Sequence, residues 1–306
     1  MKGFIIKRLI LLLPVVFGVF TLVFFLIHLI PGDPVDLMLG ENARAVDKET
    51  LRKELRLDEP LGKQYLLFMG GAIRGDFGRS LHSKQPVIKV ILNRYPETIK
   101  LTIAAMIMAL FISLPIGTYS ALRQYSFMDN SSMFLALLGV SMPNFWLGPL
   151  LMIVFSVNLG WFPISGDEGL SSIVLPAITL GTAMAAILSR MVRASMLEVI
   201  RQEYITTARA KGLSERRVMF NHALKNALVP VITIIGLQFG ALLAGAIITE
   251  TIFSWPGIGR LLIQAINTRD YPLVQGCVLA ISISYVVVNL ITDIAYSYID
   301  PRIKLG

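Results

Sequence analysis

The sequence has little charge. Only 16 % of its 306 residues are Asp, Glu, Lys or Arg, whereas 55 % are hydrophobic. Soluble domains carry about 25 % charged residues, so this chain lacks the polar surface that keeps such domains in solution. Its formal net charge is +8. In so apolar a chain we interpret that excess as the positive-inside bias of a membrane protein, and we expect no binding of nucleic acid.

Reactive side chains are equally scarce. The single cysteine, Cys277, excludes an internal disulfide, and together with three histidines it leaves too few ligands for a zinc site. The phosphate-binding pattern G-x-x-x-x-G-K-[ST] is absent, as are the hydrolase patterns G-x-S-x-G and H-E-x-x-H. We therefore expect that the chain is not an enzyme and binds no cofactor itself.

Long uncharged runs stand where charge is missing. Residues 9–30 form the first run, and its 22 residues exceed the core of about 7–15 residues found in a signal peptide, so it predicts a retained membrane helix. Five more runs follow, at residues 101–122, 131–166, 170–189, 226–249 and 271–292. The run 131–166 is too long for one span, so we expect its helix to end near Trp161, at the membrane interface. The pattern predicts an all-α membrane protein with six transmembrane helices.

The polar stretch at residues 31–100 is nearly balanced in charge. Asp47 is placed to cap a helix with Leu51 and Leu55 on one face. A second helix is indicated by apolar residues at helical spacing: Leu61, Tyr65, Phe68 and Ala72. We expect a small helical cap on the membrane surface. The predicted division is a first transmembrane helix (1–30), an extracytoplasmic cap (31–100) and a five-helix core (101–300).

The basic residues predict the orientation. If the amino terminus is cytoplasmic, fourteen Lys and Arg residues lie at the cytoplasmic ends of the spans, whereas the short outer loops hold only Arg260 and Arg269. Positive charge accumulates on the cytoplasmic side, and long loops are exempt from this rule. We therefore expect both termini in the cytoplasm, together with the polar segment at about residues 197–226.

A few polar residues fall in or near the predicted spans. Glu250 lies near the outer end of the fifth span and Asp293 near the inner end of the sixth. An ionisable residue within a span would indicate an ion route, but from helix ends we expect both side chains to reach water. Glu250 is also a candidate gate or contact residue. Gln238, Ser284 and Asn289 could line a pathway or bond between helices.

The segment at 197–226 has the pattern of two helices joined by a glycine. In the first helix the apolar residues follow one another at steps of three and four positions, which places them on one face: Leu197, Ile200, Tyr204 and Ala208. Gly212 is expected to end that helix, and Ser214 to cap a second one. That second helix would carry Val218, His222 and Lys225 on one face. The basic charge of the segment could simply hold the membrane topology, or it could bind a lipid surface or a docked protein. Against the lipid surface, the first helix carries small residues, whereas lipid binding favours bulky side chains.

These residues carry a resemblance to a known family. The segment resembles the EAA loop of ABC-importer permeases through Glu203-Tyr204, Ala208-Arg209-Ala210-Lys211-Gly212, His222, Asn226 and Pro230. A strict EAA motif has alanines after the glutamate, where this chain has Tyr204-Ile205, as is usual in the peptide branch. Other ordered motifs resemble the same family, the dipeptide/oligopeptide/nickel importers, in the subunit with a long first outer loop: Lys7-Arg8, Pro31-Gly32-Asp33-Pro34, Gly75-Asp76-Phe77-Gly78, Phe253-Ser254-Trp255-Pro256-Gly257-Ile258-Gly259, Arg269-Asp270-Tyr271-Pro272 and Asp300-Pro301-Arg302.

The resemblance implies a type I importer in a bacterial or archaeal plasma membrane. An extracytoplasmic binding protein would deliver substrate to two homologous permeases, and two ATP-binding subunits, which use ATP and Mg, would move them between inward- and outward-open states. It implies that Tyr204 and Ala208 form the close-packed face towards the ATPase, that Glu203 and Arg209 set charge complementarity, and that Gly212 makes the elbow. The predicted ATPase-coupling residues are Glu203, Tyr204, Ala208, Arg209, Lys211 and Gly212.

Several functions remain open at this point. Within the family the substrate could be a dipeptide, an oligopeptide, a glutathione-like peptide or a nickel chelate, and no substrate-binding or metal-binding residue is predicted. An ion-coupled secondary transporter would need charged groups near the bilayer centre, and uptake that persists without ATP would identify it. A membrane scaffold would show no substrate accumulation even when all partner subunits are present.

Overall fold

A computed structural model describes residues 2–29, 33–40, 43–167 and 169–299 of the chain. Within that part, every regular element is a helix, which confirms the predicted fold class. The chain folds as two compact units, and each is described separately below.

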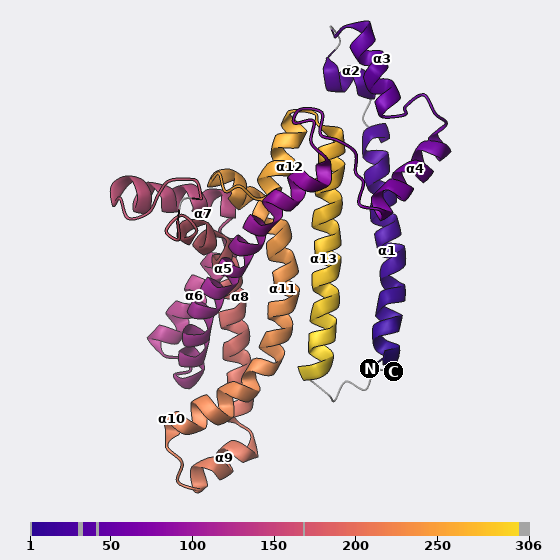
Figure 1. The fold of residues 1–306 in the computed structure, drawn as a ribbon. Coiled ribbons are helices and arrows are strands. Elements are labelled where there is room, and N and C mark those ends of the chain that lie inside the picture. The colour runs from indigo at the N-terminus through magenta and orange to yellow at the C-terminus, as the bar shows by residue number, and fades with distance from the viewer. Residues whose placement is uncertain (1, 30–32, 41–42, 168, 300–306) are drawn as a thin grey trace. The chain divides into compact units, whose positions relative to one another are not determined.

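The first unit contains residues 99–255 and 287–299 of the described chain. Its helices are the second part of α5 (Val87–Leu122), α6 (Phe127–Ser141), α7 (Asn144–Leu151), the π-helix η1 (Met152–Asn158), α8 (Val174–Ile200), α9 (Glu203–Ala210), α10 (Glu215–Arg217), the π-helix η2 (Val218–Leu224), α11 (Lys225–Ile252) and the end of α13 (Tyr271–Ile299). Helix α8 lies at the centre of the unit, where it packs against α6, α7 and α11 (Figure 1). Leu188, Val192 and Met196 of α8 are almost fully buried in the core.

The second unit contains residues 2–98 and 256–286. Its helices are α1 (Lys2–Leu29), α2 (Pro34–Leu39), α3 (Ala45–Glu54), α4 (Leu61–Ile73), the start of α5, α12 (Ile258–Asn267) and the start of α13. Helix α4 packs against α1, with Phe20 and Val23 buried at their contact. The side chain of Gln275 in α13 donates to the Val23 carbonyl oxygen at 2.9 Å, so a polar contact also joins α13 to α1.

The predicted helices of the polar stretch form, with one difference. The helix predicted from Leu61 is α4 (Leu61–Ile73). The other predicted helix is α3, but its N-cap is Arg44 and not Asp47. Asp47 lies in the first turn, where its carboxylate pairs with Arg44 at 2.8 Å and complements the positive end of the helix dipole. Asp33, Pro34 and the start of α2 follow the first helix as a capped turn, whereas Pro31 and Gly32 lie outside the described residues.

The apolar helices correspond to the predicted spans. Within the described residues, four helical stretches are long and apolar enough to cross a membrane: α5, α8, the stretch Glu215–Leu243 of α10, η2 and α11, and α13. Helices α6 and α7 with η1 form a bent pair that would be a fifth span. Helix α1 is 28 residues long, and its described apolar part is Ile10–Phe25.

We expected the run 131–166 to form one helix, but the structure has two helices there. The run breaks between α6 and α7 with a bend of 107°. Met142 is extended, with φ −83° and ψ 117°, a conformation that the following Pro143 favours because its ring crowds a helical residue before it. The regular structure ends at Asn158, which agrees with the predicted end near Trp161.

Two helices extend beyond their uncharged runs. Helix α5 begins at Val87, well before residue 101, and α8 continues to Ile200, past residue 189. Charged residues are excluded from the lipid core but are good helix formers, so they end a span without ending a helix. The uncharged runs therefore predicted where the spans lie, but they predicted helices shorter than α5 and α8 are.

Candidate coupling site

The candidate coupling site is the turn that joins α8 to α11 through α9, α10 and η2 (Figure 1). The helix predicted to run from Leu197 to Gly212 is in fact two helices. Helix α8 ends at Ile200, and α9 begins at Glu203 after an extended Gln202 with φ −75° and ψ 146°. This break changes which side of the segment faces inward, so that Ile205 rather than Tyr204 enters the core.

Helix α9 has a buried side and an exposed side. Ile205 is fully buried and Ala208 is only 7 % exposed, both packed in the core of the first unit. Tyr204 is 42 % exposed, and the other predicted residues Glu203, Arg209, Lys211 and Gly212 are exposed as well. The expectation that Tyr204 and Ala208 share one outward face does not fit this geometry, because Ala208 packs into the core of the first unit while Tyr204 is exposed.

Gly212 forms the elbow that the sequence predicts. Its φ is +77°, in the left-handed region that favours glycine. The Gly212 N–H donates to the Arg209 carbonyl oxygen at 2.9 Å, and the Leu213 N–H donates to that of Ala208 at 3.4 Å. These two bonds are the Schellman pattern, which satisfies the last free carbonyl groups of a helix and needs a left-handed residue at this position.

The second helix begins as predicted and then departs from the α-helical pattern. Ser214 is the N-cap of α10, although its side chain makes no capping bond. From Val218 the chain forms the π-helix η2, in which Val218 and Ala223, five residues apart, are both buried. The predicted face of Val218, His222 and Lys225 is therefore wrong, because it assumes α-helical spacing and Lys225 is exposed.

An ion pair spans the elbow. The guanidinium of Arg209 donates to both carboxylate oxygens of Glu215, at 2.7 Å and 3.2 Å. Hydrogen bonding to this carboxylate raises the pKa of Arg209 above its ordinary value. Both side chains remain open to solvent, at 40 % and 60 % exposure. The pair thus bridges α9 and α10 across Gly212 on the exposed side of the elbow.

Polar bonds join the elbow to α11 and join α11 to α8. The amide of Asn226 in α11 donates to the Tyr204 hydroxyl at 3.1 Å and to the His222 carbonyl oxygen at 2.8 Å. The buried Ser195 hydroxyl in α8 donates to the Ala227 carbonyl oxygen at 2.8 Å. A displacement of α9 would therefore reach α8 and α11 through short contacts.

A buried ion pair that the sequence did not predict joins α6 to α8. Arg193 of α8 donates to both carboxylate oxygens of Asp129 in α6, each at 2.7 Å. Asp129 is 1 % exposed and also accepts the Tyr125 N–H at 2.9 Å. The available signal was an acid at the start of one predicted span and an arginine at the end of another. Because 64 residues separate them in sequence, the sequence does not show that they lie next to each other.

The other polar residues divide into corrected and open cases. Glu250 does not reach water from its helix end, because it is fully buried and engaged by neighbouring groups. Ser284 accepts a hydrogen bond from the Tyr95 hydroxyl, so it joins two helices. Gln238 and Asn289 are half-buried, and either role remains open for them. The side chain of Asp293 and the motif at residues 300–302 lie outside the described residues.

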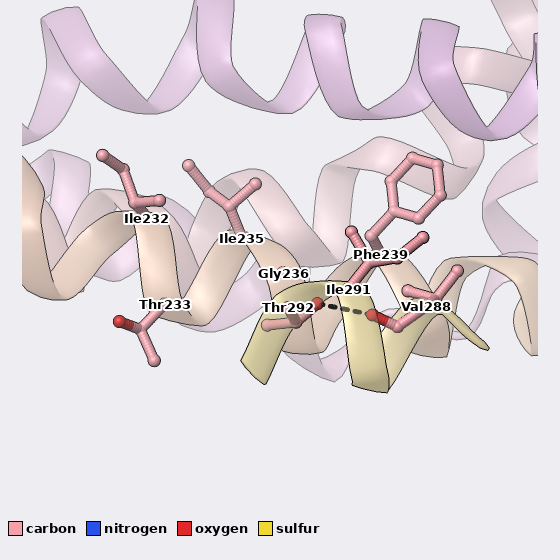
Figure 2. A pocket seen from close by; sticks show the side chains of 8 residues that line it. All are labelled: Ile232, Thr233, Ile235, Gly236, Phe239, Val288, Ile291 and Thr292. Carbon is pink, nitrogen blue, oxygen red and sulfur yellow. Dashed lines mark hydrogen bonds between the residues drawn. The ribbon is translucent and has the colours of Figure 1, made fainter. Parts of the chain in front are cut away.

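A cavity of about 300 Å³ lies between α11 and α13 in the first unit. Figure 2 shows Ile232, Ile235 and Phe239 projecting to one side of α11. The hydroxyl of Thr292 points back to the Val288 carbonyl oxygen of its own helix, at 2.8 Å. The walls are thus almost wholly apolar, and the exception is Thr233, whose buried hydroxyl has no hydrogen-bond partner among the described residues.

Comparison with known proteins agrees with this architecture. Residues 113–305 match the family described as binding-protein-dependent transport system inner membrane component, and residues 1–102 match its N-terminal region. The dipeptide transport system permease protein DppB of Alkalihalophilus pseudofirmus is 46 % identical, and the alignment covers 99 % of this chain and 100 % of that protein. The glutathione transport system permease protein GsiC of Escherichia coli is 43 % identical, with 99 % of both chains covered.

A solved structure has the same fold at low identity. A chain of the MetNI methionine ABC transporter, in an inward-facing conformation, has a TM-score of 0.57 and 17 % identity, covering 69 % of this chain and 96 % of its own. The family match, the relatives that align along their whole length and the arrangement of the long helices agree with one another. The chain therefore belongs to the family of inner membrane components of binding-protein-dependent transport systems, as a permease subunit of an ABC importer.

Proposed function

We propose that this permease forms half of a transmembrane pathway for short peptides and receives its driving force at the α9–α10 elbow. The observation that carries the proposal is a chain of hydrogen bonds: Asn226 of α11 bonds to Tyr204 of the exposed helix α9, and Ser195 of α8 bonds to the Ala227 carbonyl oxygen of α11. A subunit bound to the outside of α9 could pull both long helices together, as a rigid body.

The coupling residues would act in two ways. Glu203, Tyr204, Arg209 and Lys211 are exposed and would contact the ATP-binding subunit. Ala208 and Gly212 would position the helix, Ala208 by packing beneath it and Gly212 by the left-handed turn. This differs from the sequence-based assignment only for Ala208, which would act through the placement of Tyr204.

The assembly would contain several partners. We propose two permease subunits, this chain and a homologous one, with two ATP-binding subunits and an extracytoplasmic binding protein. ATP and Mg would be used by the ATP-binding subunits, since this sequence has no G-x-x-x-x-G-K-[ST] pattern to hold phosphates. The chain would lie in a bacterial or archaeal plasma membrane, in contact with its lipid, with both termini and the elbow in the cytoplasm.

Short peptides are the substrate class best supported by the relatives. Two of them are named for dipeptide or di/tripeptide transport and another for glutathione transport. Glutathione is itself a small peptide, so the names share one chemistry. Nickel chelates are the alternative within the family, and a ligand screen of the cognate binding protein would separate the two.

Crosslinking would test the elbow directly. The only native cysteine, Cys277, is buried, so single cysteines can be introduced without removing it. In the complete transporter, Tyr204→Cys is expected to crosslink to an ATP-binding subunit. Ala208→Cys, one helical turn away and buried, is the matched control and is expected to give little product. If Tyr204→Cys reacts only with phospholipid, the elbow is not the coupling site.

An ion-coupled transporter is the second candidate. Glu250 is buried at the end of α11 and is the ionisable residue that such a mechanism would use. Uptake that continues after ATP depletion and stops when the proton gradient collapses would support it. Uptake that requires ATP and survives Glu250→Gln would exclude it.

A further inference from the structure

A cavity of about 960 Å³ lies within the second unit. Its walls come from the end of α1, from α4, from the loops on either side of α4 and from the start of α13. Ligand pockets commonly have volumes of about 300–1,000 Å³, so this one is large enough for a small molecule.

The basic residues that line the cavity differ from the others in the same loop. Between positions 33 and 84, five bases form ion pairs with acids: Arg44, Lys48, Arg52, Lys53 and Lys63. The other four bases of that stretch make no ion pair among the described residues, and all four line the cavity: Arg56, Arg74, Arg79 and Lys84. Positive charge within the described part of this loop is thus left unpaired at one place only.

Two of these bases are held in a costly backbone conformation. Arg56 has φ +54° and Lys84 has φ +57°, both in the left-handed region. At Arg56 the bonds are those of a Schellman turn, from its own N–H to the Lys53 carbonyl oxygen and from Leu57 to Arg52. Glycine satisfies such a turn without strain, so the turn alone does not account for a charged side chain at either position.

The remaining walls supply two further kinds of group. Phe24 and Phe68, whose ring centroids are 5.7 Å apart, and Phe77 give an apolar floor. Glu54 and Asp76 add two exposed carboxylates to the lining. A ligand that fits would have an anionic group for the bases, a cationic group for the acids and apolar side chains.

We infer that this cavity binds a short peptide through its free carboxylate, with the peptide ammonium towards Glu54 or Asp76. The inference rests on the proposed function, since it makes the cap a second contact point for the transported peptide. An acidic segment of the binding protein could bind the same bases. Its negative charges would, however, lie near the carboxylates of Glu54 and Asp76, which would repel them. The zwitterionic peptide satisfies both signs.

The test is equilibrium binding of radiolabelled alanyl-phenylalanine to the detergent-purified transporter without its binding protein. The key variant is Arg56→Gly with Lys84→Gly, which removes two cations and relieves two strained turns. The matched control is Lys53→Gln with Lys63→Gln, which removes two cations of the same loop that lie off the cavity and are already paired. We expect the double glycine variant to bind about tenfold more weakly while its melting temperature is unchanged or higher, and the control to bind within about twofold of the parent.

A second ligand separates carboxylate recognition from apolar binding. Alanyl-phenylalanine amide lacks the carboxylate and is expected to bind about tenfold more weakly to the parent protein. The inference is overturned if the parent shows no saturable binding, if the double glycine variant binds the peptide like the parent, or if the amide binds as tightly as the acid. A variant that loses affinity for the binding protein but keeps affinity for the peptide also overturns it, in favour of protein docking.

The proposed function is tested separately by ATP-driven peptide uptake in proteoliposomes that contain the complete transporter and its binding protein. Uptake by a transporter that shows no saturable peptide binding at the cap refutes the cavity site and leaves the proposed function standing. No uptake of any peptide by the parent transporter refutes the proposed function itself.

Discussion

Two regions of the first unit can be compared: the crossing of α8 with α5 and α6, and the elbow between α9 and α10. Both contain an arginine–carboxylate pair and a glycine, but the crossing is buried and the elbow is exposed. Each has an arginine that donates to both oxygens of a carboxylate, at distances down to 2.7 Å. The Arg193–Asp129 pair is buried, with 21 % and 1 % of its side chains exposed. The Arg209–Glu215 pair is open to water, with 40 % and 60 % exposed. The geometry is alike, but the energetic consequence of losing a partner differs greatly.

The glycines of the two regions show the same contrast. At Gly181 in α8, an added Cβ would lie 2.6 Å from the Ala105 carbonyl oxygen of α5, so no side chain fits. At Gly212 there is nothing within 4 Å of such an atom, but φ is +77°. One glycine is required by lack of space and the other by backbone conformation. The crossing is therefore closely packed, whereas the shape of the elbow depends on local backbone conformation and its outer side is exposed.

The largest expected effect is at the buried pair. Asp129→Ala leaves the Arg193 guanidinium without its partner in a mostly buried site, and we expect a loss of about 3 kcal/mol in stability. Thermal unfolding followed by size-exclusion chromatography in detergent would measure it. Glu215→Ala is the matched control at the exposed pair. Asp129→Leu combined with Arg193→Met should recover most of the loss, and a double variant no better than Asp129→Ala would contradict the desolvation argument.

The next effect is at the helix crossing. Gly181→Ala forces a methyl group against the backbone of α5, which cannot move aside as a flexible side chain would. We expect destabilisation of about 1–3 kcal/mol and a lower yield of folded transporter. Gly18→Ala is the control, because Gly18 lies in a long helix with open space around it. Equal yields from the two variants would show that α5 and α8 are not in contact as described.

The sequence predicted the long helices and the elbow because both depend on local patterns. Apolar runs indicate spans wherever the chain lies, and Gly212 is a helix end on backbone grounds alone. The first turn of α3 shows the limit of such patterns, since Asp47 has the right residue type for a cap but lies inside the helix and pairs with its N-cap Arg44. Element type was thus easier to predict than the exact boundary.

The features that sequence could not supply depend on tertiary packing. The break at Gln202 and the π-helix from Val218 are decided by which residues enter the core, namely Ile205, Val218 and Ala223. The 3.6-residue period gives a different inner face in each case. The partner of Asp129 and the burial of Glu250 likewise depend on neighbours that are distant in sequence.

The third prediction concerns the elbow. Gly212→Val places a β-branched residue in the left-handed region, at a cost of roughly 1–2 kcal/mol, and we expect the elbow to change shape rather than the bundle to unfold. Membrane insertion should be normal while ATP-driven uptake falls severalfold. Gly212→Asn is the control, because asparagine adopts this conformation more readily. Normal uptake by Gly212→Val would show that the elbow geometry does not matter for coupling.

The smallest effect is expected at the exposed pair, and there the comparison becomes sharpest. Glu215→Gln removes one charge from a solvent-exposed ion pair, which typically contributes less than about 1 kcal/mol, so the melting temperature should hardly change. Arg209 could still contact an ATP-binding subunit, but the two-pronged contact between α9 and α10 would be reduced to a single hydrogen bond at most, because glutamine offers only one oxygen and no negative charge. We therefore expect ATP hydrolysis to continue with fewer peptides transported per ATP, most clearly at high salt, where the remaining electrostatic contacts are screened.

Arg209→Lys keeps the charge but loses the two-pronged contact, so it should show the same defect if the angle between α9 and α10 controls coupling. If Arg209→Lys transports normally while Glu215→Gln does not, charge rather than geometry controls the elbow.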